Sequence, residues 1–225
     1  MKQEIKITVP TNWSAVTLQT YLDLQRDLKT YGETEEGYVA CLFHHLAGFP
    51  VEYIKSLDID TFTSIKNDLV GFMGNVELPL QKIIHIDGVE YGFEPNLSKM
   101  VYGAYLDIVN YDTFQIDDNW SKVMSILYRP VTKRMGDLYN IADYDGNIDS
   151  VKFLNVGMDV HWGALFFFVR ILTELLNDTL NSLMDQVEIP HNIKSILAEN
   201  GKTTPLSFNS PTEILERLRK LQSFP

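Results

Sequence analysis

The sequence predicts a mainly α-helical protein with a small β element, an α+β fold in which a helical bundle surrounds one buried central helix. Residues 161–184 carry apolar side chains at helical spacing, and in the first half of this segment these occupy nearly the whole circumference. Residues 82–93 contain two short runs, KIIHI and VEYGF, which flank an Asp-Gly pair in the pattern of a β-hairpin. A helix that is apolar on every side is buried, so we expect the other helices to cover residues 161–184.

The composition is that of a globular protein with one large domain or two small ones. The chain has 225 residues, of which 45% are hydrophobic and 22% are charged. The periodicity changes from helix to strand near residue 80. We therefore predict a strand plus a helical cluster over residues 1–79, and the hairpin plus a helical core over residues 80–225. One continuous domain is the alternative.

Charge and apolar runs argue against two classes of partner. The 30 acidic and 19 basic residues give a formal net charge of −11, which repels phosphate backbones and argues against nucleic acid as the main partner. The longest apolar run ends at Arg170, far short of the roughly 20 residues of a membrane span. The single cysteine, Cys41, excludes an internal disulfide and fits a reducing cytosol, and the N-terminus lacks the apolar core of a signal peptide. We expect a soluble, cytoplasmic protein.

The first 75 residues are predicted to form one strand and several helices. Residues 4–10 alternate apolar and polar side chains, which predicts a short half-buried strand closed by Pro10. The helices are indicated by apolar residues at helical spacing, acidic first turns and glycines just past the ends. They comprise residues 17–30, residues 33–47, a short turn over 51–57, and a helix capped by Asp58 or Asp60 with apolar positions from Phe62 to Met73.

Two further helices are predicted between the hairpin and the central helix. Asn96 to Ser98 offer a cap for a helix over residues 99–110, with Met100, Val101, Tyr105 and Ile108 facing the core. The segment NWSKVMSILYR forms the second helix. Pro130 should end it, because the residue before a proline is pushed out of the helical region.

The remaining segments are predicted from turn and cap signals. Residues 131–155, with an Asp-Gly pair at Asp145-Gly146, are expected to be a connecting loop. Residues 189–202 are predicted to form a weak short helix. A terminal helix opens at Ser210 to Glu213, a capping box with proline at the first helical position.

The histidines lack the spacing of metal ligands. His44 and His45 are adjacent on a helix, so their side chains diverge by roughly 100° and cannot chelate one ion. The run DYDGNID, with Asp143, Asp145 and Asp149, departs from the EF-hand pattern because its glycine comes two positions too early. We expect an acidic turn and no metal site. A small metal-dependent hydrolase that uses this loop with His161 is kept as the competing function, and stabilisation by metal would support it.

Neither nucleophilic catalysis nor cofactor binding is indicated. Cys41 and His44 share a helix face, but no orienting partner or activating cation accompanies them. Gly201-Lys202-Thr203 resembles the end of a phosphate-binding loop, yet Pro205 blocks the helix that such a loop requires. The sequence also contains no nucleophile elbow and no dinucleotide-binding fingerprint. We expect a protein that is not an enzyme and takes no cofactor.

Two parts of the sequence, made up of four segments, resemble assembly proteins of tailed bacteriophages. CLFHHLAGFPVEYIKSLDIDTFTSIKNDLVGFM resembles the helical segment of tail assembly chaperones. GVEYGFEPNLSKMVYGAYLDI, followed by NWSKVMSILYRPV and GALFFFVRILTELL, is similar to a morphogenesis-region protein of phages infecting Bacteroidetes, including crAss-like phages. The resemblance implies a non-enzymatic protein that binds other phage structural proteins in the host cytoplasm during tail or head-tail assembly. It leaves open a transient chaperone or a permanent virion component such as a ring, and self-association in either form.

Aromatic residues and one distinctive tetrad supply the candidate interaction residues. Tyrosines in half-polar settings suit protein interfaces, although tyrosines that line a core with outward hydroxyls are the commoner case. In the tetrad, Leu127 should pack, Pro130 should end the helix, and Arg129 should bind the last helical carbonyls or a carboxylate such as Asp107. The candidates are Tyr102, Tyr105, Tyr128, Arg129 and Pro130.

Overall fold

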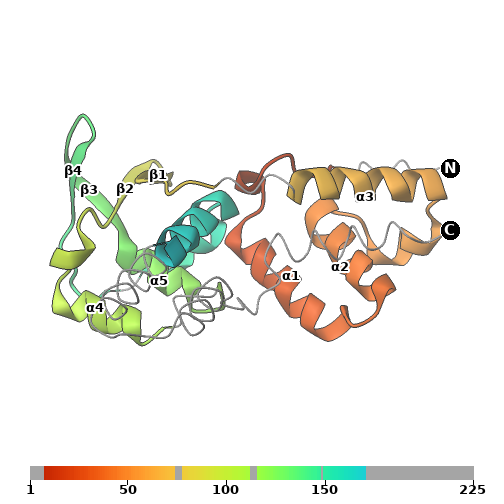
Figure 1. The fold of residues 1–225 in the computed structure, drawn as a ribbon, viewed down its shortest axis with the longest axis horizontal. Coiled ribbons are helices and arrows are strands. Elements are labelled where there is room, and N and C mark those ends of the chain that lie inside the picture. The colour runs from red at the N-terminus through yellow and green to blue at the C-terminus, as the bar shows by residue number, and fades with distance from the viewer. Residues whose placement is uncertain (1–7, 74–77, 112–115, 148, 171–225) are drawn as a thin grey trace, which may run out of the picture.

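The computed structural model describes residues 8–73, 78–111, 116–147 and 149–170. The molecule is elongated (Figure 1): helices α1 to α3 form one end, and the sheet with α4 and α5 forms the other. A helix over residues 158–170 lies between the two ends. The mainly helical structure with one small antiparallel sheet confirms the predicted α+β class.

The N-terminal helices lie where apolar spacing and terminal glycines predicted them. Side-chain oxygens of Thr17 and Thr34 accept hydrogen bonds from backbone N–H groups in the first turns of the first two helices. Gly48 ends the second with φ of 64°, the left-handed conformation that glycine adopts readily. Residues 8–10 have no regular structure, and the rest of the strand predicted over 4–10 lies outside the described residues. The elements are η1 (Trp13–Ala15), α1 (Leu18–Tyr31), α2 (Glu35–Ala47), η2 (Val51–Ser56) and α3 (Ile59–Met73).

The sheet contains four antiparallel strands in the order β1-β2-β3-β4. Strands β1 (Ile83–Ile86) and β2 (Val89–Phe93) form the predicted hairpin. Both turn residues have positive φ, 51° at Asp87 and 79° at Gly88, as a type I′ turn requires.

The prediction of a connecting loop over residues 131–155 is wrong. This segment contains most of β3 (Tyr128–Met135), all of β4 (Leu138–Ile141) and η4 (Val151–Asn155). Residues 132–135 of β3 are exposed on both faces, and β4 has only four residues, of which Tyr139 and Ile141 are half-buried, so neither strand shows the apolar alternation by which a half-buried strand is recognised. Their only strong signal was the Gly-Asp pair of the turn, in which Gly136 has φ of 61°.

The helices around the hairpin are shorter than predicted. After η3 (Leu97–Lys99), helix α4 spans Tyr102–Val109, and Asn96 makes no side-chain cap. Val101 and Tyr105, predicted to face the core, are more than half exposed, whereas Met100 and Ile108 pack against it as predicted. Helix α5 (Trp120–Leu127) ends two residues before Arg129, and the chain continues directly into β3.

One hydrophobic core extends through both ends of the molecule. The helix over residues 158–170 begins three residues before the predicted start at 161, and the part of the predicted helix beyond 170 lies outside the described residues. Its Trp162 is 2% exposed and makes edge contacts with Trp13 at 6.3 Å and Tyr21 at 5.4 Å between ring centroids. Buried side chains from Trp13 to Leu165 thus form one continuous cluster. Within the described ranges, no helix is both long and apolar enough to cross a bilayer.

Candidate functional site

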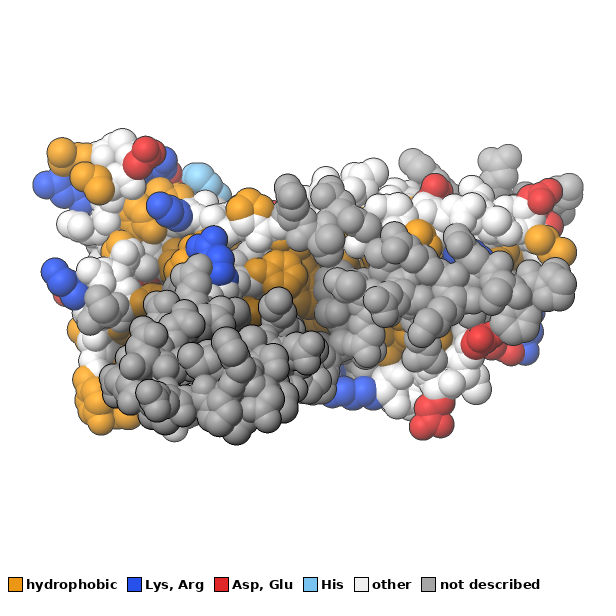
Figure 2. Space-filling model, viewed as in Figure 1, with side chains coloured by type: hydrophobic (Ala, Val, Ile, Leu, Met, Phe, Trp, Pro, Cys, Tyr) orange, Lys and Arg blue, Asp and Glu red, His pale blue; other side chains and the backbone are white. Residues whose placement is uncertain are grey.

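Helix α4 presents an exposed apolar face to solvent. Its positions four residues apart, 101, 105 and 109 together with 102 and 106, lie on one side of the helix. Figure 2 shows hydrophobic side chains gathered at the lower left, over α4. We call this face the α4 surface. It consists of Val101 (53% exposed), Tyr102 (73%), Tyr105 (54%), Leu106 (41%) and Val109 (59%).

The α4 surface arises because the helix has more apolar residues than its buried side accommodates. Ala104 is fully buried, and Ile108 packs against the core. The rings of Tyr102 and Tyr105 stack on one another with centroids 6.4 Å apart. The structure therefore brings these two predicted residues together. A contiguous exposed apolar patch of this kind is typical of a surface that contacts another protein.

The opposite side of α4 is joined to β3 through Arg129. The Arg129 guanidinium donates to the Glu94 carboxylate, and the two side chains are only 11% and 10% exposed. Arg129 also lies 6.0 Å from the centre of the Tyr144 ring, and the Tyr144 hydroxyl donates to Asp107 on α4. Burial and the hydrogen bond to Asp107 raise the pKa of Tyr144. We call these four side chains the Arg129 cluster.

The partner predicted for Arg129 is not the one that the structure shows. The carboxylate that pairs with Arg129 is Glu94, not Asp107. The terminal carbonyl of α5 is also satisfied by Glu94, whose backbone N–H donates to the Leu127 oxygen at 2.7 Å. Glu94 and Tyr144 were not among the predicted residues. Each is far from Arg129 in sequence, and only the pairing of strands brings them together.

Tyr128 and Pro130 lie apart from the α4 surface. Tyr128 is 1% exposed, its ring packs on Phe93 at 5.2 Å, and its hydroxyl donates to the Gln81 carbonyl at 2.6 Å. Burial raises the pKa of this phenol. Pro130 is exposed on β3. In this conformation Tyr128 has almost no surface to offer a partner.

His161, proposed for the competing hydrolase, is a core residue. It is fully buried, its Nδ1 accepts a hydrogen bond from Trp120 Nε1 at 3.2 Å, and its Nε2 donates to the Phe153 carbonyl at 3.2 Å. Burial lowers its pKa to about 3, so the ring is neutral. Both nitrogens are occupied, which leaves none for a metal or a substrate.

The other titratable candidates are likewise held by local contacts. Asp145 accepts from the Asn147 backbone N–H at 2.9 Å, and Asp149 pairs with Lys152. Burial raises the pKa of the Cys41 thiol, the opposite of what a nucleophile needs. Within the described residues, no three His, Cys, Asp or Glu side chains are placed to hold a metal ion.

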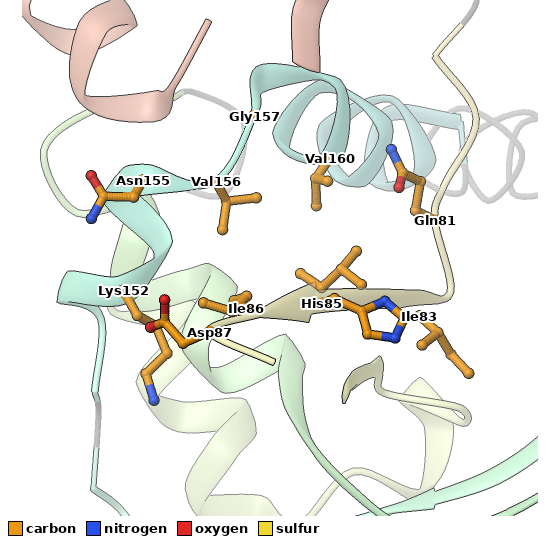
Figure 3. A pocket seen from close by; sticks show the side chains of 11 residues that line it. Gln81, Ile83, His85, Ile86, Asp87, Lys152, Asn155, Val156, Gly157 and Val160 are labelled. Atoms are coloured by element: carbon orange, nitrogen blue, oxygen red, sulfur yellow. The ribbon is translucent and has the colours of Figure 1, made fainter. Parts of the chain in front are cut away.

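A cleft of about 370 Å³ runs between β1 and the start of the helix over residues 158–170. Figure 3 shows Val156 and Val160 projecting toward β1 across it. The amide of Gln81 donates to Asp159 at 2.6 Å, and the Lys152 ammonium donates to the Tyr91 hydroxyl at 2.8 Å. These polar groups are bound to other protein groups, so the cleft is a seam between sheet and helix.

Neither a scan against protein-family models nor searches of curated proteins and of solved structures found a match to this chain.

Proposed function

We propose that this chain is a non-enzymatic assembly protein of a tailed bacteriophage, which binds other phage structural proteins during tail or head-tail morphogenesis. The observation that most directly supports binding is the α4 surface, where five large apolar side chains are 41% to 73% exposed on one short helix. The phage setting is supported by the sequence resemblance of residues 41–73, 88–108, 119–131 and 163–176. The protein acts in the host cytoplasm.

The chemistry of the α4 surface suits recognition of a partly apolar protein. Tyr102 and Tyr105 supply large rings that lose little conformational entropy on binding, and their hydroxyls can donate at a polar rim. A helix of 8 residues is about 12 Å long, which is short for a permanent interface. This size favours the transient, chaperone-like form of the proposal. A permanent virion component, such as a ring or head-tail junction protein, is the alternative.

The binding role is tested by substitution on α4. The tagged chain and its Leu106→Asp variant serve as baits in a lysate of phage-infected cells, and mass spectrometry identifies and quantifies the captured proteins. The proposal expects tail or head-tail proteins on the wild-type bait, reduced about tenfold or more on the variant. Val151→Asp is the matched control, since Val151 is 69% exposed outside the α4 surface. Equal capture by all three baits would refute the role of α4.

Whether the protein is a transient chaperone or a permanent virion component is tested by where it is found after infection. Mass spectrometry of purified particles and of lysate asks whether the polypeptide stays in the virion. Abundance in lysate with absence from particles supports the chaperone form. A fixed copy number in particles identifies a virion component, and absence from both contradicts the phage assignment.

A further inference from the structure

Strand β1 forms one edge of the sheet, because the order β1-β2-β3-β4 leaves it with a single neighbouring strand. Its residues pair one to one with those of β2, from Ile83 with Gly92 to Ile86 with Val89. In an antiparallel pair, alternate residues bond to the neighbouring strand, and the residues between them direct their N–H and C=O groups away from it. One side of β1 is therefore an open row of backbone donors and acceptors.

The hydrogen bonds between β1 and β2 identify the residues that face outward. The Phe93 N–H donates to the Lys82 carbonyl at 2.8 Å, so the pair that precedes Ile83 is a bonded one. By alternation, Ile83 and His85 are the outward residues of β1. Within the described part of the chain, no group outside the sheet bonds to their backbone. Two N–H groups and two carbonyls are thus left without partners.

The cleft of about 370 Å³ lies on this open side of β1. Every residue from Ile83 to Asp87 lines it, whereas no residue of β2 does, so it follows β1 on the side that faces away from β2. Residues 155–157 and Val160 form the opposite wall. Figure 3 shows Val156 and Val160 projecting toward β1 from that wall. The unpaired backbone groups of β1 therefore open toward the cleft.

The two faces of β1 have different surroundings. Ile84 and Ile86 are 5% and 7% exposed, and they belong to the core cluster that also contains Val160. The side chain of His85 on the other face is 65% exposed. A strand placed beside β1 would therefore have one face against Val156 and Val160 and the other face in solvent. Its side chains would alternate between apolar and polar.

Strand β1 lacks the features that usually protect an exposed edge. Its four residues, IIHI, include no proline and no lysine, and its pairing with β2 has no bulge. The side chains of Gln81 and Lys152 at the cleft are already bound to Asp159 and Tyr91. The backbone of β1 is therefore the part of this cleft that is left to bind a ligand.

We infer that the cleft binds an extended segment of a partner protein, which adds to β1 as a further antiparallel strand. An extended backbone presents N–H and C=O groups at the same two-residue repeat, about 7 Å, as the outward groups of β1. Residues of the segment that bond to Ile83 and His85 turn their side chains to solvent. The residues between them turn apolar side chains toward Val156 and Val160. This inference does not depend on the phage assignment or on the α4 surface.

A lone segment fits this edge better than the β1 strand of a second copy. Two copies of β1 that paired antiparallel would be related by a two-fold axis perpendicular to the sheet. Their helices over residues 158–170 would then lie on the same face, and both would occupy the space above the seam. A segment that carries no such helix avoids this clash.

Fluorescence anisotropy tests the inference with the full-length chain and a short fluorescent peptide of alternating threonine and valine. The wild-type chain is expected to bind this peptide saturably. His85→Pro removes one outward N–H, at a position where an edge strand tolerates proline, and should weaken binding about tenfold or more. His85→Thr is the matched control, because it keeps the N–H and loses only the imidazole, and it should bind like wild type. Circular dichroism confirms that both variants are folded.

Two modified peptides test the backbone contacts on the wild-type chain itself. N-methylation of the threonines, whose N–H groups point at β1, should abolish binding. N-methylation of the valines, whose N–H groups point away, should leave the affinity nearly unchanged. The inference is overturned if the unmodified peptide does not bind saturably, or if the two methylated peptides bind equally. A wild-type dimer in sedimentation velocity that the peptide dissociates would assign the cleft to a second copy and overturn it as well.

Discussion

His161 shows how one buried side chain makes stability depend on pH. The folded protein holds the ring neutral between Trp120 and Phe153, with a pKa lowered to about 3, whereas an unfolded chain has a histidine pKa of about 6.5. As pH falls below about 6.5 the unfolded state takes up a proton that the folded state excludes. The free energy of unfolding therefore decreases between about pH 6.5 and pH 3.

Comparison with His161→Gln isolates this effect. Between pH 7 and 5.5, wild type should lose about 1 kcal/mol more of its unfolding free energy than the variant, because the glutamine does not titrate. Urea denaturation at both pH values measures the difference. The other histidines are common to both proteins and cancel. Equal losses would mean that His161 is protonated in the folded state.

Arg129 is expected to stabilise the contact between α4 and the sheet. Arg129→Ala leaves the Glu94 carboxylate, only 10% exposed, without its cation and should lower the unfolding free energy by about 2 to 4 kcal/mol. Arg134→Ala is the control, since Arg134 is 44% exposed in its pair with Glu90 and its loss should cost at most about 1 kcal/mol. Thermal denaturation measures both. Unchanged melting temperature and partner binding for Arg129→Ala would contradict the role given to the Arg129 cluster.

At the scale of elements, replacing two glycines in different settings by alanine should have opposite effects on stability. A Cβ on Gly92 would lie 2.5 Å from the Tyr139 ring, so Gly92→Ala must displace the base of the β3–β4 hairpin. We expect a loss of about 1 to 3 kcal/mol. A Cβ on Gly103 in α4 would meet nothing closer than 3.9 Å, so Gly103→Ala should stabilise the helix by up to about 1 kcal/mol. Urea denaturation measures the unfolding free energy of both variants. A change in the same direction for both would contradict the packing of Tyr139 on β2.

Elements with strong local signals were predictable, and those without them were not. Apolar spacing and terminal glycines marked α1 and α2, and the Asp-Gly pair marked the β1–β2 hairpin. Strands β3 and β4 were missed because the outer part of β3 is exposed on both faces and β4 is too short to show alternation. For α4 the helix was predicted, but the side that it buries was not. Its apolar residues occupy most of its circumference, and the prediction that Val101 and Tyr105 face the core was wrong, because both are more than half exposed.

At the scale of the whole molecule, the continuous core should make unfolding cooperative. Trp162 packs against Trp13 and Tyr21, which belong to the other end of the molecule. Trp162→Ala should cost about 3 to 5 kcal/mol and lower one shared transition. Far-ultraviolet and near-ultraviolet circular dichroism should report the same midpoint for wild type and variant. Two separate transitions would instead support independent domains over residues 1–79 and 80–225.

The sequence predicted only part of the candidate site, because the interactions that form the rest join residues far apart in the chain. Tyr102 and Tyr105 were proposed as interaction residues because tyrosines in half-polar segments suggest interfaces, whereas Leu106 and Val109 resemble core residues until the packing of α4 is known. For Arg129, a buried ion pair was foreseeable from its type, but its partner Glu94 lies 35 positions away along the chain.

The sequence by itself determined the fold class, most helix positions and the β1–β2 hairpin, because caps, turn residues and apolar spacing act within a few residues. Tertiary structure alone decided which face of α4 stays in solvent, that β3 and β4 form a hairpin, and that His161 is buried in the core. These outcomes depend on strand pairing and packing between residues far apart in the chain. Local propensity carries no information about such contacts.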